Sequence, residues 1–426
     1  MNHLKNLEYL YSLIRLGIKT DLRNITALCE RFGHPQNSYP IIHIAGTNGK
    51  GSTAAMISSV LTASGLKCGL YTSPHLINFG ERIRIDGKII SDEEASEMIE
   101  ELRPVFDELQ STFFESTTLM AFLRFARENI DVAVVETGLG GTLDATNIVN
   151  SSVSVFTPIS YDHTDRLGTE LHLIAADKAG IIKPNTITVS SQQEPEALNE
   201  LTKRAVQQNS DFIYAPDFAS ISDGEESDSG SFVNIECPTD EDLSGQYSIS
   251  APGKHQWMNL QTTLTALYAI KKCGIGNIAS SSVKEGIEKF RWKGRLEILR
   301  DNPRVYYDVA HNPAAAKVVA EFFQRQFPDK KVHIVLGIAI DKDAEKTLAT
   351  LAPIAADFTF VKIDNPRAAD PERLASIAKI FDIPIQTLID PSIALEQVIK
   401  EAKKDDLVLL TGSHYLAGTA HKNLTK

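Results

Sequence analysis

Short apolar runs alternate along the chain with segments in which apolar residues recur every three to four positions. From residue 39 onward, the β-branched runs predict strands at Pro40–Ala45, Cys68–Thr72, Val132–Thr137, Val153–Thr157 and Thr186–Ser190. The intervening spacing predicts helices at Thr53–Ala63, Asp92–Leu109, Thr117–Asn129, Leu171–Ala179 and Glu196–Gln208. Such alternation is typical of βαβ units around a mostly parallel sheet.

A second alternating set begins at Arg304. Strands are predicted at RVYYDVA, KVHIVLGI, DFTFVKI and DLVLLTG, and helices at 313–326, 343–352, 371–380 and 391–403. A helical stretch at Gln256–Lys272 precedes this set, and the boundary is expected near Phe290–Arg295. We therefore expect an α/β chain with a larger domain at 1–292 and a smaller one at 293–426. Two such domains that meet at a cleft commonly form a small-molecule site.

Two segments fall outside this alternation. The N-terminus predicts an amphipathic helix whose apolar face carries Leu4, Leu7, Tyr11, Leu13 and Ile14. Between Ala205 and Gly253 there is no Lys or Arg, and SDGEESDSGS at 222–231 has the composition of an exposed loop. We interpret this acidic stretch as a solvated insertion between edge strands.

Composition and charge narrow the class of protein. A chain of 426 residues suggests two or three domains, at roughly 100–200 residues each. The net charge of -12 argues against a nucleic-acid surface, which needs clustered Lys and Arg. The N-terminus lacks the apolar core of a signal peptide, and no run approaches the roughly 20 apolar residues of a membrane span. Cys29, Cys68, Cys237 and Cys273 form no C-x-x-C pair. We expect a cytoplasmic protein that binds neither nucleic acid nor membrane.

A glycine-rich loop at 46–52 follows the first predicted strand and precedes a helix. The backbone N–H groups of such a loop, together with a helix N-terminus, favour a polyphosphate. Lys50 adds a positive charge and Ser52 a hydroxyl for metal or phosphate. Because Gly51 separates these two residues, the loop departs from the general G-x-x-x-x-G-K-[ST] pattern. The alternative is a tight turn with no ligand, but a turn does not require Lys and Ser at these positions.

Polar clusters lie at the ends of three other predicted strands, where parallel sheets place ligands. Ser73, Glu136 and His163 would each direct one ligand atom toward the loop phosphates. A mixed oxygen and nitrogen site with room for phosphate and water suits Mg²⁺ or Mn²⁺. Taken singly each residue is weak evidence, because an isolated His near a strand end is more often a hydrogen-bonded structural residue.

Lys178 lies in the apolar segment Asp177–Pro184, which predicts a partly buried side chain. Burial lowers the pKa of a lysine, and a neutral amine reacts with carbon dioxide. The alternative is a lysine at a helix end that pairs with an acid.

Together these motifs resemble the folylpolyglutamate synthase and dihydrofolate synthase family, a branch of the Mur ligases. The resemblance covers nearly the whole chain in order, through HIAGTNGKGS (43–52), LYTSPHL (70–76), ERI (81–83), ETGLGGTLDATN (136–147), DH (162–163), KAGIIK (178–183), GKHQWMN (253–259), GRLE (294–297) and DVAHNP (308–313). It implies a P-loop-type Mur-ligase domain with a mostly parallel sheet, followed by a Rossmann-like C-terminal domain.

The resemblance also implies roles for the candidate residues. ATP would be bound by Gly49, Lys50, Gly51, Ser52, Asn259, Arg295, Asp308 and His311. Ser73, Glu136 and His163 would bind Mg²⁺, with two ions expected, and Lys178 would be carbamylated. We expect Lys50, His163, Lys178 and Arg295 to act in catalysis, with Arg295 offsetting developing phosphate charge. An ion pair between Arg295 and Asp308, and helix capping by the DVAHNP segment, remain alternatives.

By the same resemblance, two segments would shape a pterin pocket. They contribute Thr112, Phe113, Phe114, Glu115, Leu143, Asp144 and Ala145. Aromatic rings there would stack on a flat ligand, although core packing explains Phe113 and Phe114 almost equally well. One departure is Thr142, where bacterial bifunctional members often have Arg.

The implied reaction is ligation. ATP would phosphorylate a carboxylate, and the amine of L-glutamate would displace phosphate from the acyl phosphate. The acceptor would be dihydropteroate, a folate carrying glutamate, or both, and we expect a monomer. Two other functions are weighed: a Mur-type ligase acting on a cell-wall nucleotide precursor, and a non-catalytic ATP-binding module.

Overall fold

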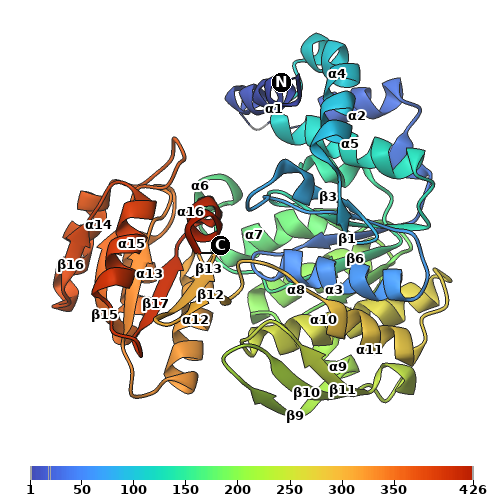
Figure 1. The fold of residues 1–426 in the computed structure, drawn as a ribbon. Helices are drawn as coiled ribbons and strands as arrows, with labels where there is room; N and C mark the ends of the chain where they lie inside the picture. Colours follow the sequence, from blue (N-terminus) through green and yellow to red (C-terminus); the bar gives the residue numbers. More distant parts are fainter. Residues whose placement is uncertain (1, 18, 20, 425–426) are drawn as a thin grey trace.

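A mostly parallel sheet forms the larger unit of the molecule (Figure 1). The computed structural model describes residues 2–17, 19 and 21–424. The sheet has the order β4-β3-β2-β5-β1-β6-β7-β8, and its strands are β1 (Ile41–Ala45), β2 (Cys68–Tyr71), β3 (Ile83–Ile85), β4 (Lys88–Ile89), β5 (Val132–Glu136), β6 (Val153–Phe156), β7 (Ile187–Ser190) and β8 (Asp211–Tyr214). Each strand predicted in this region is confirmed, one residue shorter than expected. Strands β3 and β4 are antiparallel additions at one edge.

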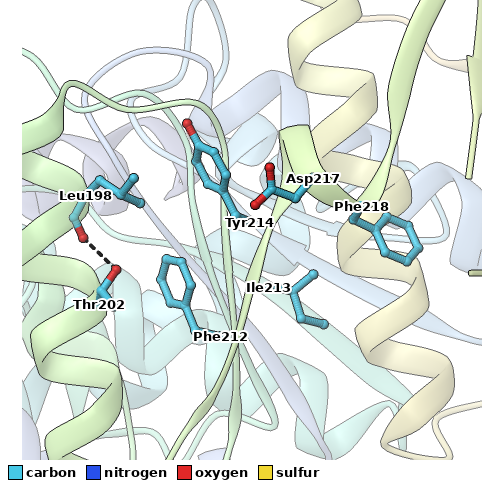
Figure 2. A pocket seen from close by; sticks show the side chains of 7 residues that line it. All are labelled: Leu198, Thr202, Phe212, Ile213, Tyr214, Asp217 and Phe218. Atoms are coloured by element: carbon cyan, nitrogen blue, oxygen red, sulfur yellow. Dashed lines mark hydrogen bonds between the residues drawn. The ribbon is translucent and has the colours of Figure 1, made fainter.

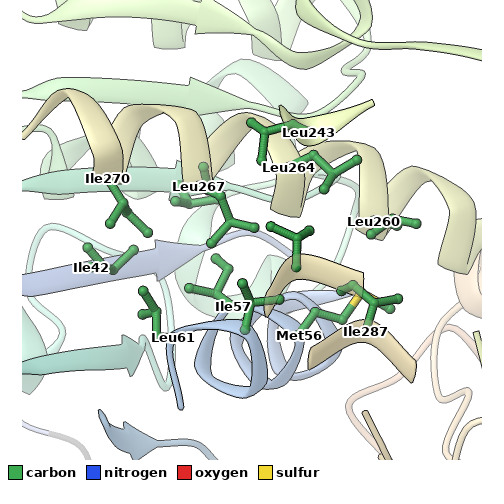
Figure 3. Close-up of a cluster of buried hydrophobic side chains, with 14 of the residues drawn as sticks. Ile42, Met56, Ile57, Leu61, Leu243, Leu260, Leu264, Leu267, Ile270 and Ile287 are labelled. Atoms are coloured by element: carbon green, nitrogen blue, oxygen red, sulfur yellow. The ribbon is translucent and has the colours of Figure 1, made fainter. Parts of the chain in front are cut away.

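Helices cover both faces of this sheet. One face packs against α1 (Asn2–Ser12), α2 (Arg23–Arg31), α4 (Asp92–Leu109) and α5 (Phe113–Arg127). The other packs against α3 (Lys50–Ala63), α10 (His255–Lys272) and α11 (Ser280–Lys289). Alternation along β1 explains the two cores, because Ile41 belongs to the first and Ile42 to the second. Figure 3 shows the second core, where side chains of α3 and α10 meet over the sheet.

The chain between β6 and β8 carries three further helices, which are α6 (Thr164–Leu167), α7 (Leu171–Lys178) and α8 (Pro195–Gln207). Helix α9 (Ala215–Phe218) follows β8 directly. Helices α7 and α8 share a further apolar core with Ala45 and Phe156 at the ends of β1 and β6. This packing fixes Lys178, the last residue of α7, against the carboxyl ends of the central strands.

Two predictions about helices near the N-terminus are corrected. Helix α5 begins at Phe113, four residues earlier than expected, because Thr112 and Glu115 form a reciprocal capping box. Helix α1 ends at Ser12, and a 3₁₀ turn follows over Leu13–Leu16. Leu13 therefore turns inward, whereas Leu4 and Ile14 are each 58% exposed. The expected apolar face is thus wrong at Leu4 and Ile14.

The acidic stretch folds into a small antiparallel sheet rather than an exposed loop. Its strands are β9 (Ser220–Glu226), β10 (Ser231–Glu236) and β11 (Gly245–Ile249), in the order β11-β10-β9. The predicted loop at 222–231 is therefore wrong except for the turn at 227–230. Alternate residues of β10, among them Val233 and Ile235, are buried in the core beside α10. One face of the sheet packs on this core, and Asp223, Glu225 and Glu236 are on the exposed side. Glu226 is opposite the buried Ser231, and its side chain is only 4% exposed.

A second sheet forms the C-terminal unit, to the left in Figure 1. Its order is β12-β13-β17-β14-β15-β16, from β12 (Glu297–Asp301), β13 (Arg304–Asp308), β14 (Val332–Leu336), β15 (Ala355–Phe360), β16 (Ile385–Thr387) and β17 (Leu407–Thr411). Its helices are α12 (Pro313–Gln326), α13 (Ala344–Leu351), α14 (Pro371–Ala378), α15 (Pro391–Glu401) and α16 (Ala417–Leu424). The predicted strands are confirmed, and β12 and β16 extend the sheet at its edges. Among the described residues, no helix combines the length and apolar character needed to cross a membrane.

Candidate active site

A cleft of about 1050 Å³ lies between the carboxyl ends of the large sheet and the C-terminal unit. It is lined by the loop after β1, by segments that follow β2, β5 and β6, and by segments that follow β13, β14 and β17. The structure brings every predicted ATP, metal and catalytic residue to this cleft: Gly49, Lys50, Gly51, Ser52, Ser73, Glu136, His163, Lys178, Asn259, Arg295, Asp308 and His311.

The glycine-rich loop is held open toward the cleft by contacts with the segment after β6. The backbone N–H groups of Thr47 and Asn48 donate to the carbonyl of Pro158, at 2.9 and 3.3 Å. Gly49 has a φ of 88° and closely faces Asn259, so a Cβ there would lie 2.5 Å from the Asn259 amide oxygen. Helix α3 starts at the next residue, three residues earlier than predicted. Its unpaired N-terminal N–H groups therefore face the cleft.

Lys50 and Ser52 lie in the first turn of α3. The Lys50 ammonium is 3.3 Å from the carbonyl of Thr47 and 3.9 Å from a carboxylate oxygen of Glu136. The Ser52 hydroxyl is buried and has no hydrogen-bond partner among the described residues. A buried polar atom without a partner is rare, and it fits a group that binds a ligand.

Glu136 is a buried carboxylate at the end of β5. Burial raises its pKa, and Lys50 and the N–H of Ser73, which donates at 3.1 Å, counteract that rise. These contacts use only part of the carboxylate's acceptor capacity. The remaining lone pairs are directed at the same cleft as Ser52 and Ser73.

His163 has a left-handed backbone, with a φ of 50°, directly after Asp162. Burial first, and the neighbouring Lys342 second, lower the pKa of His163 to about 4. The imidazole is therefore neutral near pH 7, the form in which histidine binds metals. Its Nε2 lies 3.4 Å from the Lys342 ammonium.

These donors fit a magnesium ion that shares its shell with phosphate and water. No group of three or more His, Cys, Asp or Glu arranged for a metal occurs in the part of the chain that the structure describes. The predicted set instead offers one hydroxyl, one carboxylate and one imidazole, from Ser73, Glu136 and His163. Magnesium in nucleotide sites is commonly held in this way, by one or two protein carboxylates plus substrate oxygens.

Asp162 is the residue that sequence reasoning missed most clearly. One of its oxygens lies 2.5 Å from the Lys342 ammonium, and the other is 3.4 Å from His311 Nε2 and accepts from Asn312 at 3.2 Å. Burial alone would raise its pKa, but His311 and Lys342 hold the pKa far below the ordinary value. The Asp162 carboxylate therefore ties the large unit to the C-terminal unit through three side chains. The sequence carried no local signal for Lys342, because the charged run Asp341–Asp343 is equally typical of a solvated loop.

Lys178 is 5% exposed and lies at the end of α7. Burial first, then the charge of Lys50, lower its pKa to about 7, and Asp177 opposes the shift. Lys178 forms no ion pair with a carboxylate of the described residues, and Asp177 instead accepts the N–H of Gly141 at 2.9 Å. The alternative in which Lys178 pairs with an acidic side chain is therefore wrong for the described residues.

The far wall of the cleft carries Arg295 and Asp308. Burial raises the pKa of Asp308, and Arg295 opposes the rise. The Asp308 carboxylate accepts backbone N–H groups from Leu296 and Ala310, at 2.9 and 2.8 Å, while Arg295 donates to the carbonyl of Gly294. No direct ion pair joins the two side chains among the residues described.

In the DVAHNP segment, Asn312 caps a helix, which was one of the alternatives expected from the sequence. Its side chain accepts from the N–H of Ala315 at 2.9 Å and so caps α12. The same side chain donates to Asn48 in the glycine-rich loop at 3.1 Å. The cap therefore also joins the two walls of the cleft.

The predicted pterin residues lie in structural contacts and are not among the described residues that line the cleft. Thr112 and Glu115 cap α5. Phe113 stacks on Tyr11 with ring centroids 5.7 Å apart, and Phe114 packs against Gly138. These contacts of Phe113 and Phe114 are packing contacts, as in the alternative considered for them in the sequence.

The second predicted pterin segment shapes the loop after β5. Asp144 is buried and accepts N–H groups from Gly138 and Leu139, at 2.9 and 2.8 Å, and also contacts Thr146. Leu143 is 48% exposed and Ala145 is buried. Asp144 therefore supports the glycines that line the cleft, and the structure assigns its carboxylate to the loop.

A separate pocket of about 460 Å³ lies beside α8, β8 and α9 (Figure 2). Its lining is mostly apolar and aromatic, with Asp217 its one carboxylate. Thr202 donates to the carbonyl of Leu198 within α8, so its hydroxyl is already used. None of the predicted site residues lies there, so this pocket is not the candidate active site.

Comparison with known proteins gives two matching domain families and close relatives over the whole chain. Residues 44–267 match the Mur ligase middle domain, and residues 294–414 match the Mur ligase, glutamate ligase domain. The dihydrofolate synthase/folylpolyglutamate synthase of Bacillus subtilis is 33% identical over 424 residues, covering 98% of each chain. The enzyme of that name from Escherichia coli is 31% identical, over 96% of this chain and 92% of its own.

Solved structures are also similar to this chain over almost its whole length. The folylpolyglutamate synthase of Mycobacterium tuberculosis, complexed with ADP and AMPPCP, superposes with a TM-score of 0.91 at 32% identity, covering 100% of this chain and 99% of its own. Escherichia coli FolC, in complex with DHPP and ADP, gives a TM-score of 0.84 at 29% identity, over 98% and 96% of the two chains.

Proposed function

Because the chain belongs to the folylpolyglutamate synthase and dihydrofolate synthase family of Mur ligases, we propose that its interdomain cleft activates a pteroyl or folyl carboxylate as an acyl phosphate. The protein is an ATP-dependent ligase that joins L-glutamate to folate substrates. The observation that carries the proposed mechanism is the set of cations and N–H donors in one cleft, with Lys50 on one wall and Arg295 on the other.

Opposing charge is the main obstacle to the first step, because a carboxylate must approach the anionic γ-phosphate of ATP. The loop N–H groups and Lys50 bind and orient the phosphates, and Arg295 offsets charge from the opposite wall. Asn259 and Asp308 position the nucleotide beside them. The Asp162 cluster holds the two walls together, which keeps water from the acyl phosphate until the amine of glutamate arrives.

Ser73, Glu136 and His163 would hold Mg²⁺, which supplies a charge that screens and orients phosphate oxygens. Lys178 would be carbamylated, giving an anionic oxygen pair for a second ion. Its neutral fraction supports this proposal, since only the unprotonated amine adds carbon dioxide. Magnetic resonance with ¹³C-bicarbonate tests it: a carbamate signal is expected from the wild type and not from Lys178→Met. A signal that persists in the variant would contradict it.

Several finer features belong to the same proposal. We divide the chain into an ATP-binding unit at 1–292 and a C-terminal unit at 293–426, since the chain crosses between the sheets at 290–296. We propose a cytoplasmic monomer, in keeping with four cysteines that are all unpaired. We also propose that the seven pterin-pocket residues shape the pterin side of the substrate site. Phe114 and Asp144 contact the loop after β5, which lines the cleft.

Both ligase activities are proposed for this chain. Purified protein with ATP, Mg²⁺ and labelled glutamate is expected to yield labelled product with dihydropteroate and, separately, with tetrahydrofolate monoglutamate. If only one of the two acceptors gives product, the activity toward the other acceptor is contradicted. ADP release with neither product would favour a different Mur-type acceptor, and no ADP release at all would favour a binding module.

A further inference from the structure

Three cations that line the cleft have no part in the phosphate chemistry described above: Lys317, Lys342 and Arg367. Lys317 is 70% exposed on α12 and lies 3.9 Å from the Glu321 carboxylate of the same helix. Lys342 is nearly buried and paired with Asp162, so it ties the two units together. Arg367 lines the same cleft from the segment after β15, and its side chain is 58% exposed. It is a charged group at the mouth of the cleft, on the C-terminal wall beside the loop that carries Lys342.

The backbone around Arg367 is held firmly. Its carbonyl accepts the N–H of Ile340 at 2.7 Å, and its N–H donates to the side chain of Asn365 at 2.8 Å. A β-bridge joins Ala368 to Ala339, next to these contacts. The segment that carries Arg367 is thus attached to the loop after β14, which leads directly to Lys342. These backbone contacts fix the point from which the Arg367 side chain extends at the mouth of the cleft.

Asp341 orients the guanidinium. One carboxylate oxygen lies 3.3 Å from Arg367 Nη1, and the Asp341 side chain is 17% exposed. A guanidinium has five N–H donors in a planar fork, so this contact leaves most of them for a ligand. The free edge of the fork suits a carboxylate, which arginine binds through two parallel hydrogen bonds.

We propose that Arg367 is a specificity-determining residue that binds a non-reacting carboxylate of the glutamyl substrates. The proposal rests on the ligase function proposed above. Incoming glutamate carries two carboxylates that take no part in bond formation, and an acceptor gains one further carboxylate with each glutamate added. Both sources present the same chemistry to the mouth of the cleft. In a chain of net charge -12, an anionic substrate needs such a local cation.

Steady-state kinetics of Arg367→Gln test the proposal. The control is Arg373→Gln, because Arg373 is an exposed arginine on α14 that does not line the cleft. KM is measured for glutamate, and for folate acceptors with one, two and three glutamyl residues. Because the side chain is largely exposed, a rise in KM of roughly 3- to 10-fold is expected, with kcat nearly unchanged. Arg367→Lys should recover part of the loss.

The two sources give different patterns, and either pattern supports the proposal. A higher KM for glutamate with every acceptor identifies the incoming amino acid, whereas a KM for acceptor that rises with glutamyl number identifies the growing chain. Values equal to those of Arg373→Gln would overturn it, as would an equal fall in kcat without a change in either KM. If the wild type itself forms no glutamyl product, the ligase proposal fails instead.

Discussion

Replacing Lys178 by methionine should make the metal-free protein more stable near neutral pH while abolishing ligation. The side chains have similar length, so the substitution chiefly removes an amine from a buried site. Burial lowers the pKa of Lys178 from 10.5 to about 7. At pH 7 about half of the folded molecules therefore carry a neutral amine, against about one in 3,000 for an ordinary lysine.

The sign of the stability effect follows from proton binding. Between pH 7 and 10.5 the unfolded chain binds more protons at this residue than the folded chain, so the residue's contribution to the free energy of unfolding rises with pH. At pH 7 the buried amine lowers the free energy of unfolding by up to about 4 kcal/mol. This value follows from a pKa lowered by about three units, at about 1.4 kcal/mol for each unit. Lys178→Met removes this loss, and the advantage should shrink toward zero at pH 10.5.

Urea unfolding without metal or bicarbonate, from pH 6 to 10.5, measures this difference. Lys203→Met is the matched control, because Lys203 is 59% exposed on α8 and should show no comparable trend. A difference between wild type and Lys178→Met that does not change with pH would refute the reasoning, as would full ligase activity in the variant.

Three further substitutions probe the contacts between the units and the loop. Asp162→Asn should leave the Lys342 ammonium buried without its counter-charge, lowering the free energy of unfolding by about 3 kcal/mol and slowing ligation; unchanged urea unfolding would contradict this. Glu226→Gln should weaken the ion pair in which a Glu226 carboxylate oxygen lies 2.9 Å from Arg325 Nε, by about 1 kcal/mol. The expected result is faster proteolysis at 290–296, with the affinity for ADP unchanged. Gly49→Ala, at a φ of 88° and facing Asn259, should cost about 1–2 kcal/mol and weaken ADP binding by calorimetry; wild-type affinity would count against the loop geometry.

The strands and the phosphate loop could be predicted closely because their signals are local. Apolar runs such as Ile41–Ala45 need burial on both faces, which the interior of a parallel sheet provides. Polar residues at the carboxyl ends of such strands, and in the loops that follow them, meet at one edge of the sheet. Ser73, Glu136 and His163 could therefore be placed in a common cleft. The resemblance to the ligase family extended this to the far wall.

Other features depend on contacts distant in sequence. Lys342 and Asp162 are 180 positions apart, and nothing local distinguishes Lys342 from a solvated charge. The polar strand β9 resembled a loop because only one of its faces is buried. Glu226 at its end and Asp228 in the turn that follows form ion pairs with Arg325 and Arg304 of the C-terminal unit. Thr112 and Glu115 did carry a local signal, since their spacing is that of a capping box.

The central claim is that ATP is consumed to activate the acceptor carboxylate. An acceptor whose reacting carboxylate is labelled with ¹⁸O, incubated with ATP, Mg²⁺ and glutamate, tests it directly by mass spectrometry of the released phosphate. An acyl phosphate requires one labelled oxygen to leave with each phosphate, in step with amide formation. Unlabelled phosphate released alongside the glutamyl product would contradict the account.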